Sequence, residues 1–586
     1  MSKWLIYNKK ENYEKLNREK SLSSIQKLIL ANRDITEENT INSFIDASVD
    51  NMYDPYLLKD MDKAVSSVFE AMIQGKMIRI IGDYDADGVS ATSILMKGLG
   101  AFYDDISYSI PDRVEDGYGL SISLVDKCIE DGVELIITCD NGIAAFSACE
   151  YAKDHGIDVI ITDHHQVIIE DGTELLPEAV AIVNPSQKSC NYPFKSICGA
   201  VVAYKLVYAL YIKYGEDFSV KREMILDLLE FASIGTIADM MDIVDENRII
   251  VIEGLKRLNN TKNLGLIELL RQLNWQREID VYTIGFVIGP TINATGRLFT
   301  AKLATELFLD NDISNLREYA AELISLNSDR KDMTKSSLDQ SVEKIIDEKL
   351  YENDIIILYN KDVHESICGL VAGRVKDMFS RPTIVLTDSF KDDQEYLKGS
   401  GRSIEAYDMH AKLSEMSSYF IAFGGHKMAC GLTIKKSDLD SFVKDVNSNS
   451  DLNEEDFLKI VNIDAALNFN MINFSLILDI DRLKPYGKGF EKPKFASKSV
   501  IINNIGLIGK NRNVLKMQLS QGDIKLDAIS FSPDKILNQF EKRFEVKDVT
   551  SNFGKILYKS IDIVFTMSIN SFNGKDSIQL IIEEIR

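Results

Sequence analysis

The sequence has few of the features that mark secreted or membrane-bound proteins. Its 586 residues include only 7 cysteines, an odd number without a CxxC pair, which argues against a disulfide framework. No apolar stretch reaches the roughly 20 residues that span a bilayer, and the N-terminus MSKWLIYNKKENYEKL has no apolar run of signal-peptide length. We therefore expect a folded cytoplasmic protein without a membrane segment.

Basic charge is also scarce. The chain carries 67 Lys and Arg against 90 Asp and Glu, and its formal net charge is −23. Proteins that coat nucleic acid by bulk attraction use cations to neutralise phosphates, so the composition argues against that mode of binding. Any contact with nucleic acid must be local, along a basic groove or through metal ions held by acidic groups.

The length and the order of apolar runs predict several domains. Residues 1–65 are polar and are expected to form a helical lead-in. From residue 77, short apolar runs alternate with amphipathic ones, as in MIRIIG, SATSILMKGLG, ELIITCD and DVIITDHH, which predicts a mainly parallel sheet within 66–315. The polar stretch 316–350 predicts a long connecting helix.

The second half of the chain predicts two further domains. Residues 351–455 fit a smaller α/β domain, with strands at IIILYN and PTIVLT and glycine-rich turns at KGSGRS and FGGHKMACG. Residues 456–586 contain strand-like runs without regular helices between them, which predicts an antiparallel barrel of the OB type. The expected fold class is thus α/β, with two α/β domains joined by a long helix and a C-terminal OB-like β-barrel.

Acidic side chains gather where three predicted strands end: Asp83, Asp85 and Asp87 in IIGDYDADGVSAT, Asp140 in ELIITCD, and Asp163 with His164 and His165 in DVIITDHH. Alone, the DxDxD triplet fits a polar turn with a helix cap equally well. Parallel strands bring their carboxyl ends to one edge of a sheet, so the recurrence favours a single shared pocket.

The predicted pocket has the donor groups of a two-metal site. Carboxylates packed this closely repel one another unless cations hold them. A set rich in oxygen, with one or two imidazole nitrogens and no thiolate, suits Mn²⁺ or Mg²⁺, and Asp140 is a reasonable bridge between two ions. Asp239, at the end of FASIGTIAD, is a candidate last ligand, although a carboxylate facing water is the commoner role at a helix end. The chemistry suggested is hydrolysis of a phosphate ester.

Other residues are candidates for substrate binding. His165 fits a phosphate contact or a proton donor to the leaving oxygen. His426 lies in a glycine-rich segment, where backbone can approach a ligand closely. The segment Lys398-Gly-Ser-Gly-Arg402 fits a phosphate cradle. Arg113 and Arg297, in glycine-bounded turns, fit the same use, with surface salt bridges as the alternative.

A basic tract in the barrel region invites two interpretations. DRLKPYGKGFEKPKFASK interleaves Lys and Arg with Tyr486, Phe490 and Phe495. Single-strand grooves combine these residue types. A solvated loop whose aromatic rings belong to the core is the competing interpretation.

The motifs together resemble the DHH phosphoesterase superfamily, and within it the bacterial exonucleases specific for single-stranded DNA. The matching segments cover most of residues 50–435 and include GDYDADGVSAT, PDRVEDGYGL, TCDNGI, TDHH, ASIGTIADM, GPTINATGRL, HESICGLVAGRVKDMFSRPTIVL, KGSGRSI and FGGHKMACGLTI. The resemblance implies a DHH catalytic domain over 66–315, a DHHA1 domain over 351–455 and a nucleic-acid-binding OB-like domain over 456–586.

The resemblance also implies an activity: hydrolysis of single-stranded DNA from the 5′ end to nucleotides, with two Mn²⁺ or Mg²⁺ ions, in DNA repair and recombination. It assigns one ion to Asp83, Asp85 and Asp140 and the other to Asp87, Asp140, His164 and Asp239. Asp140, His164 and His165 are then the catalytic residues, with His165 beside the scissile phosphate. The pocket for the DNA 5′ end corresponds to Arg113, Ser400 and Arg402, while Arg374 and His426 resemble substrate-side groups.

Two residues depart from the family pattern. Thr291 stands where Arg is usual and Thr295 where Ala is common, and neither is a proposed metal ligand. Three other activities stay open: a DHH nuclease for short oligonucleotides or cyclic dinucleotides, a catalytically dead DNA-binding relative, and a manganese pyrophosphatase. The expected partners are single-stranded DNA, a single-stranded-DNA-binding protein and a helicase, and the expected state is a monomer.

Overall fold

The computed structural model describes residues 2–111, 119–298, 301–389, 395–572 and 574–586, without the side chains of 39, 297 and 298. The chain forms two compact units, one of residues 53–241 and 253–459, the other of residues 2–52, 242–252 and 460–586. The expected N-terminal lead-in therefore does not form one segment. Residues 2–52 belong with the C-terminal residues, because β1 (Lys3–Ile6) pairs in parallel with β14 (Ile460–Ile463).

The first α/β domain is built on a five-stranded sheet with the strand order β3-β2-β4-β5-β8. All its pairings are parallel, as the sequence predicted. The strands are β2 (Ile78–Ile81), β3 (Ile106–Ser109), β4 (Leu135–Cys139), β5 (Asp158–Thr162) and β8 (Ala181–Val183). Every residue of β4 is buried, which fits a strand with helices on both faces.

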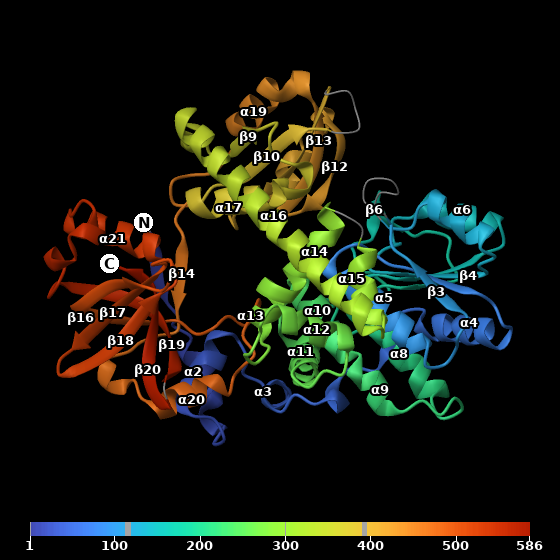
Figure 1. The fold of residues 1–586 in the computed structure, drawn as a ribbon, viewed down its shortest axis with the longest axis horizontal. Helices are drawn as coiled ribbons and strands as arrows, with labels where there is room; N and C mark the ends of the chain where they lie inside the picture. Colours follow the sequence, from blue (N-terminus) through green and yellow to red (C-terminus); the bar gives the residue numbers. More distant parts are fainter. Residues whose placement is uncertain (1, 112–118, 299–300, 390–394, 573) are drawn as a thin grey trace. The chain divides into compact units, whose positions relative to one another are not determined.

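Helices cover both faces of this sheet. Figure 1 shows α6 (Ile122–Glu130) on one side of β3 and β4, with α4 (Met61–Ile73) and α8 (Gly199–Tyr214) on the other. On the α6 side, Val125 and Cys149 join a core cluster with Ile136 of β4. On the opposite side, α8 packs against α5 (Ala86–Leu99), the helix that begins in the acidic motif.

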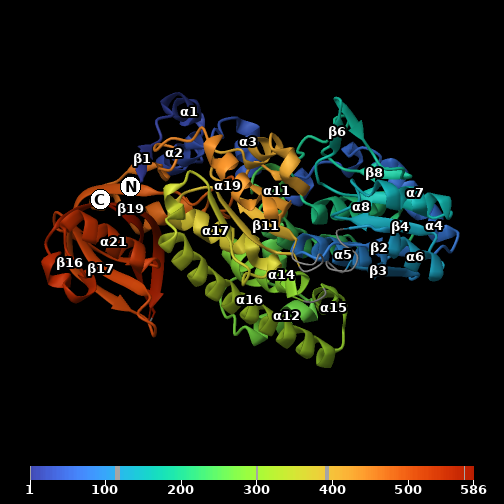
Figure 2. The same cartoon turned by 90° about the horizontal axis from the view of Figure 1, so that it is seen from above.

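Of the other helices before the second sheet, α7 (Phe146–Asp154) lies between β4 and β5, and the rest follow β8 in sequence. These later helices are α9 (Arg222–Asp227), α10 (Leu229–Ala238), α12 (Leu264–Gln272), α13 (Val281–Thr283), α14 (Gly289–Leu298) and α15 (Lys302–Leu309), with α11 (Asp245–Leu258) shared between the two units. The predicted connecting helix is present as α16 (Ile313–Asp347), 35 residues long. Figure 2 shows it running beside α12 and α15 toward α17.

The second α/β domain has a five-stranded sheet with the strand order β12-β13-β11-β10-β9. Its strands are β9 (Ile356–Tyr359), β10 (Thr383–Asp388), β11 (Tyr396–Arg402), β12 (Phe420–His426) and β13 (Ala429–Lys435), and its helices are α17 (Cys368–Phe379), α18 (Met409–Ser414) and α19 (Leu439–Ser448). β9 and β10 are parallel, and the other pairings are antiparallel.

The prediction of a glycine-rich turn was wrong for KGSGRS but correct for FGGHKMACG, where Lys427 and Met428 form the turn between β12 and β13. KGSGR lies within strand β11, and FGGH ends strand β12. The glycines of β11 are required by close packing instead of by a turn. A Cβ on Gly401 would lie 2.3 Å from the sulfur of Met409, and one on Gly399 would lie 2.3 Å from the carbonyl oxygen of Val385.

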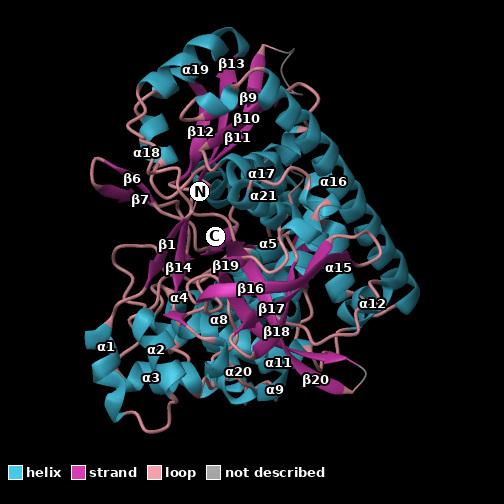
Figure 3. Cartoon of the chain, turned by 90° about the vertical axis from the view of Figure 1, so that its left-hand side faces the viewer, coloured by secondary structure: helices cyan, strands magenta, loops and turns pink. Residues whose placement is uncertain are grey.

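The C-terminal residues form the predicted barrel, but it is not wholly antiparallel. Strands β16 (Phe495–Ile508), β17 (Val514–Gln521), β18 (Ile524–Ser530), β20 (Lys575–Ile585) and β19 (Ser560–Phe572) pair in this order, and β19 pairs back with β16 to close the barrel (Figure 3). Strands β18 and β20 pair in parallel, and the helix α21 (Pro533–Phe544) separates β18 from β19 in sequence. The same unit contains β15 (Ala465–Ala466), α1 (Lys10–Lys15), α2 (Ser24–Asn32), α3 (Glu38–Ile45) and α20 (Phe474–Asp481).

The basic and aromatic tract of this unit follows the competing interpretation. Phe490 and Phe495 are fully buried in the core, and the Tyr486 hydroxyl donates a hydrogen bond to the carbonyl of Ile480. The buried rings of Phe490 and Phe495 cannot stack on bases, so these two aromatics do not belong to a single-strand groove. Among the described residues, no helix is both long and apolar enough to cross a membrane.

The crossing of α5 and α8 generates a stability prediction. A Cβ on Gly98 would lie 2.6 Å from both methyl groups of Val207, so Gly98→Ala should destabilise the protein by about 1 to 3 kcal/mol through overpacking. This loss should exceed the gain of about 1 kcal/mol from better helix propensity. Calorimetric unfolding of G98A, V207A and the double variant would measure it. The stability lost by the double variant should be smaller than the sum of the stability losses of the two single variants. Additive losses of stability would contradict close contact at this crossing.

Candidate active site

The acidic motif after β2 is folded around the start of α5. The Asp85 carboxylate caps this helix by accepting hydrogen bonds from the amides of Asp87 at 2.9 Å and Gly88 at 3.0 Å. Asp83 precedes the cap and is buried. A Cβ on Gly88 would lie 2.6 Å from the Cβ of Asp83, so only glycine allows the helix to begin this close to the strand.

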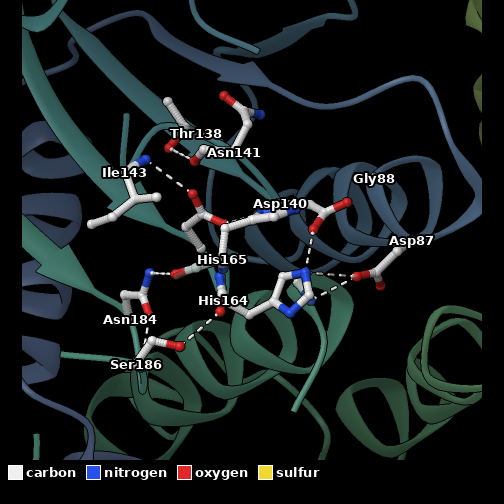
Figure 4. Close-up of polar contacts among 12 residues, drawn as sticks. Asp87, Gly88, Thr138, Asp140, Asn141, Ile143, His164, His165, Asn184 and Ser186 are labelled. Carbon is white, nitrogen blue, oxygen red and sulfur yellow. Dashed lines mark hydrogen bonds and ion pairs between the residues drawn. The ribbon is translucent and has the colours of Figure 1, made fainter. Parts of the chain in front are cut away.

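The three predicted strand ends meet at one place. The His164 Nε2 atom lies 3.1 Å from Asp140 Oδ1 and 3.8 Å from Asp87 Oδ2. Asp239, which ends α10, brings its Oδ2 within 3.9 Å of the same nitrogen. Figure 4 shows the His164 ring between Asp140 and Asp87.

These side chains form overlapping groups whose ligand atoms lie within 4.8 Å of one another: Asp83, Asp85 and Asp140; Asp87, His164 and Asp239; and Asp140, His164 and His165. Asp140 belongs to two of the groups. This position suits the bridging role expected from the sequence. All six expected metal ligands therefore belong to these overlapping groups.

Backbone amides at the start of α8 hold Asp87. The amide of Gly199 donates to its Oδ2 at 2.7 Å, and the amide of Ala200 donates to its Oδ1 at 3.0 Å. A helix N-terminus directs its backbone amides at an anion, so the start of α8 fixes the position of this carboxylate. Glycine is required for the approach: a Cβ on Gly199 would lie 2.4 Å from Asp140 Oδ1, and one on Gly235 would lie 2.3 Å from Asp87 Oδ1.

Asparagine side chains fix the loops that carry the ligands, and the sequence interpretation missed them. Asn141 donates to the carbonyls of Ile81 and Gly82, which ties the end of β4 to the end of β2. Asn293 accepts a hydrogen bond from the amide of Ala86 at 2.7 Å, and Asn184 donates to the His165 carbonyl at 2.9 Å. The position of Asn141 directly after Asp140 was the available signal, since an amide there can bridge neighbouring strand ends.

The electrostatics of the cluster fit bound cations. Burial, followed by repulsion from neighbouring carboxylates, raises the pKa values of Asp83, Asp85 and Asp140. The Oδ1 atom of Asp83 is buried and accepts no hydrogen bond from any residue that the structure describes. Buried charges need a compensating partner, so this donor set fits divalent cations that prefer oxygen ligands.

The two histidines of the DHH motif have opposite electrostatic environments. Burial lowers the pKa of His164, which favours the neutral imidazole that can ligate a metal. Burial also disfavours the charged form of His165, but a 2.7 Å hydrogen bond to Asp163 outweighs it and raises the pKa to about 9. The Asp163 carboxylate in turn accepts hydrogen bonds from the amides of Ile143 and His164.

A pocket of about 930 Å³ adjoins the cluster. Asp163, His165 and Gln166 line it from the first α/β domain, and strands β11, β12 and β13 line it from the second. Ser400 lies in its wall, whereas Arg402 and His426 are not among the lining residues. The structure therefore brings one residue of the expected 5′-end site into the same cavity as His165.

The strand register shows which face of the second sheet carries the expected substrate residues. Ser400 pairs with Gly431, which pairs with Gly424, and Arg402 pairs with Ala429, which pairs with His426. Paired and alternate residues share one face of a sheet, so Ser400, Arg402 and His426 lie on the same face. The Arg402 guanidinium is largely buried and donates to the carbonyl of Gly401 at 2.8 Å.

Three arginines, Arg374, Arg113 and Arg297, are the remaining residues expected to bind substrate. Arg374 lies on the exposed side of α17. Burial, and then the charge of Arg374, lowers the pKa of Arg330 on α16, a nearby cation that the sequence interpretation missed. Arg113 and the side chain of Arg297 lie outside the described residues.

Thr291 and Thr295, the two residues that depart from the family pattern, are buried in α14. Thr291 donates a hydrogen bond to the Val287 carbonyl and accepts one from Asn327, while Thr295 donates to the Ile292 carbonyl. Both hydroxyls therefore bond within the protein.

Comparisons with known proteins match the three domains in order. The DHH family N-terminal domain matches residues 77–236, the DHHA1 domain matches 352–449, and the RecJ OB domain matches 463–584. With the acidic cluster at the sheet edge, these matches define a member of the DHH superfamily.

Relatives identify the branch of the superfamily. The single-stranded-DNA-specific exonuclease RecJ of Bacillus subtilis is 34% identical over 95% of this chain and 67% of that protein. RecJ of Haemophilus influenzae is 34% identical over 92% of this chain and 93% of its own length. The chain belongs to the RecJ family. This confirms the resemblance inferred from the motifs.

The fold agrees with a solved relative. The crystal structure of RecJ in complex with Mn²⁺ from Thermus thermophilus aligns with a TM-score of 0.80 and 23% identity, over 100% of this chain and 79% of that one. At this identity the match supports the fold: a DHH domain, a DHHA1 domain and a C-terminal barrel.

The repulsion within the cluster generates a metal-dependence prediction. Raised folded pKa values mean that ionisation of these carboxylates destabilises the metal-free protein increasingly as the pH rises above about 4. Asp140→Asn should therefore raise the unfolding temperature of the chelator-treated protein at pH 8 by about 2 to 4 °C and reduce the further rise caused by Mn²⁺.

Differential scanning fluorimetry with EDTA or Mn²⁺ would measure both changes. The exposed Asp105→Asn is the control and should behave as the wild type. A D140N variant that is less stable without metal, or that keeps the full shift with Mn²⁺, would contradict this account of the cluster.

Proposed function

We propose that the chain is a metal-dependent exonuclease that hydrolyses single-stranded DNA from the 5′ end and releases 5′-mononucleotides. The observation that carries the proposal is the juxtaposition of the Asp and His cluster with a nucleotide-sized pocket whose wall includes Ser400. The relatives named as single-stranded-DNA-specific exonucleases support the same substrate.

The metal ligands fall into two sets that share Asp140. With Asp140, Asp83 and Asp85 would hold one divalent ion, and Asp87, His164 and Asp239 would hold the other. Mn²⁺ or Mg²⁺ at these ligands would supply a water of lowered pKa and would neutralise charge on phosphoryl oxygens. The RecJ structures solved with Mn²⁺ and with Mg²⁺ support this choice of ions.

Hydrolysis removes one nucleotide in each turnover. The oxygen of water bonds to the phosphorus between the first and second nucleotides, and the bond from that phosphorus to O3′ of the first nucleotide breaks. O3′ takes up a proton and becomes a hydroxyl, while the shortened strand keeps the phosphate at its new 5′ end. The first nucleotide occupies the pocket during this step, with its 5′-phosphate toward Ser400.

His165 positions the scissile phosphate. Its ring lines the pocket, and Asp163 holds its Nδ1 atom at 2.7 Å, which leaves Nε2 as the atom directed to substrate oxygens. Arg402, Arg374 and His426, with Arg113 and Arg297, contribute further substrate contacts.

The barrel supports a longer substrate than a dinucleotide. The RecJ OB domain matches residues 463–584, and OB folds commonly bind single strands. We place the activity in DNA repair and recombination in the cytoplasm, on a monomer that a single-stranded-DNA-binding protein and a helicase recruit. The buried thiols of all seven cysteines are consistent with a reducing compartment.

A time course on end-labelled DNA tests the proposal. A 3′-labelled single strand should shorten progressively from the 5′ end with Mn²⁺ or Mg²⁺, and a 5′-labelled strand should release labelled mononucleotide at once. EDTA should stop both reactions, and Asp140→Ala should abolish hydrolysis while DNA binding persists. Cleavage of dinucleotides alone, release of phosphate from pyrophosphate, or unchanged turnover by D140A would contradict the proposal.

The role of His165 is tested separately. His165→Asn should lower kcat by about 10²-fold to 10⁴-fold, because a positioned proton donor or phosphate contact is lost near the scissile bond. The matched control is His155→Asn, since His155 is exposed and contacts the Tyr151 carbonyl and ring, away from the pocket lining. Steady-state kinetics with Mn²⁺ would measure both variants. Equal activities for H165N and H155N would rule out this role.

A further inference from the structure

The pocket contains an ion pair that the reaction scheme leaves unused. Lys398 Nζ lies 3.4 Å from Glu365 Oε1, and both residues line the cavity that holds His165 and Ser400. Their side chains are 51% and 23% exposed. Exposed pairs of this kind contribute little to folding, so stability does not explain a carboxylate inside a pocket for a polyanion.

Strand geometry places Lys398 beside Ser400. The two residues are alternate positions of β11, so their side chains leave the same face of the sheet about 7 Å apart. Lys398 pairs with Thr433 and Ser400 pairs with Gly431, and both partners also line the pocket. The cation is therefore the neighbour of the hydroxyl that faces the proposed 5′-phosphate.

The floor of the pocket beside Ser400 is bare backbone. A Cβ placed on Gly424 or Gly431 would meet no described atom within 4 Å, and the two glycines are directly paired across β12 and β13. A phosphate and its sugar can thus approach the sheet closely beside Ser400. Lys398 lies at one edge of this floor, where its long side chain can reach a bound anion.

We propose that Lys398 binds the 5′-phosphate of the terminal nucleotide together with Ser400, and that Glu365 weakens this contact so that the mononucleotide product leaves. The inference rests on the proposed 5′ exonuclease function. Lys398 is a substrate-binding residue in this scheme, and Glu365 is a positioning residue that acts through Lys398.

The chemistry of the reaction explains why the contact between Lys398 and the phosphate needs to be weakened. The released mononucleotide keeps the same 5′-phosphate that anchored the strand, so cleavage alone does not loosen this anchor. A second cation without a counter-charge would hold product and substrate equally well and would slow each turnover. Glu365 competes with the phosphate for Lys398, and its carboxylate also repels the bound anion.

The charge-neutralising variants should act in opposite directions. Lys398→Gln should raise the inhibition constant of thymidine 5′-monophosphate about tenfold and reduce the preference for a 5′-phosphate over a 5′-hydroxyl end. Glu365→Gln should lower the same inhibition constant about fivefold and lower kcat, because product release slows. Inhibition by unphosphorylated thymidine should change in neither variant.

Steady-state hydrolysis of 5′-phosphorylated and 5′-hydroxyl single strands with Mn²⁺, with both compounds as inhibitors, measures these constants. The control is Lys412→Gln, which breaks the 3.0 Å ion pair with Asp451 in the same domain outside the pocket lining. It should behave as the wild type.

Shifts in the same direction for K398Q and E365Q would assign the pair a structural role and overturn the inference. Wild-type constants in both variants would overturn it as well. Failure of the wild-type protein itself to hydrolyse single-stranded DNA would instead contradict the proposed function, so the two failures are distinguishable.

Discussion

Carboxylates that repel one another are held in one small volume at the edge of the parallel sheet, and the rest of the first domain is arranged around that constraint. Repulsion and burial raise the pKa values of Asp83, Asp85 and Asp140. The amides at the start of α8 hold Asp87. Glycines at positions 199 and 235 let helices approach the carboxylates without a side chain between them. The fold thus holds a cluster whose charge divalent cations can balance.

The second α/β domain meets a different physical demand. Its sheet presents Ser400, Arg402 and His426 on one face, and glycines keep the centre of that face free of side chains. A mononucleotide can lie on such a surface close to the backbone. The proposed function therefore divides hydrolysis and binding, with metal chemistry on the parallel sheet and phosphate recognition on the mixed one.

Much of this arrangement was predictable from the sequence. The carboxyl ends of parallel strands lie at one edge of a sheet, so the sequence alone predicts that Asp83, Asp140 and His164 lie together. The long helix near 316–350 and the barrel followed from their hydrophobic patterns. The DHH resemblance supplied the roles of Ser400, Arg402 and His426, which no local pattern distinguishes from ordinary surface residues.

Other features depend on contacts between distant segments. Glycines usually mark turns, so the sequence predicts one at KGSGR, whereas pairing with β10 and β13 makes this segment a strand. Residues 2–52 join the C-terminal unit through the pairing of β1 with β14 and through a core shared by side chains such as Leu16 and Phe495, which are far apart in sequence. Asn293 reaches Ala86 from α14, and spacing alone could not reveal that contact. Burial of Phe490 and Phe495 likewise emerges only when the core closes.

The central claim is that one cluster holds two divalent ions bridged by Asp140. Anomalous diffraction from crystals of the full chain soaked with Mn²⁺ tests it most directly. The account predicts two anomalous peaks that share Asp140, one with Asp83 and Asp85 and the other with Asp87, His164 and Asp239. Peaks elsewhere in the chain, or none at this cluster, would contradict it.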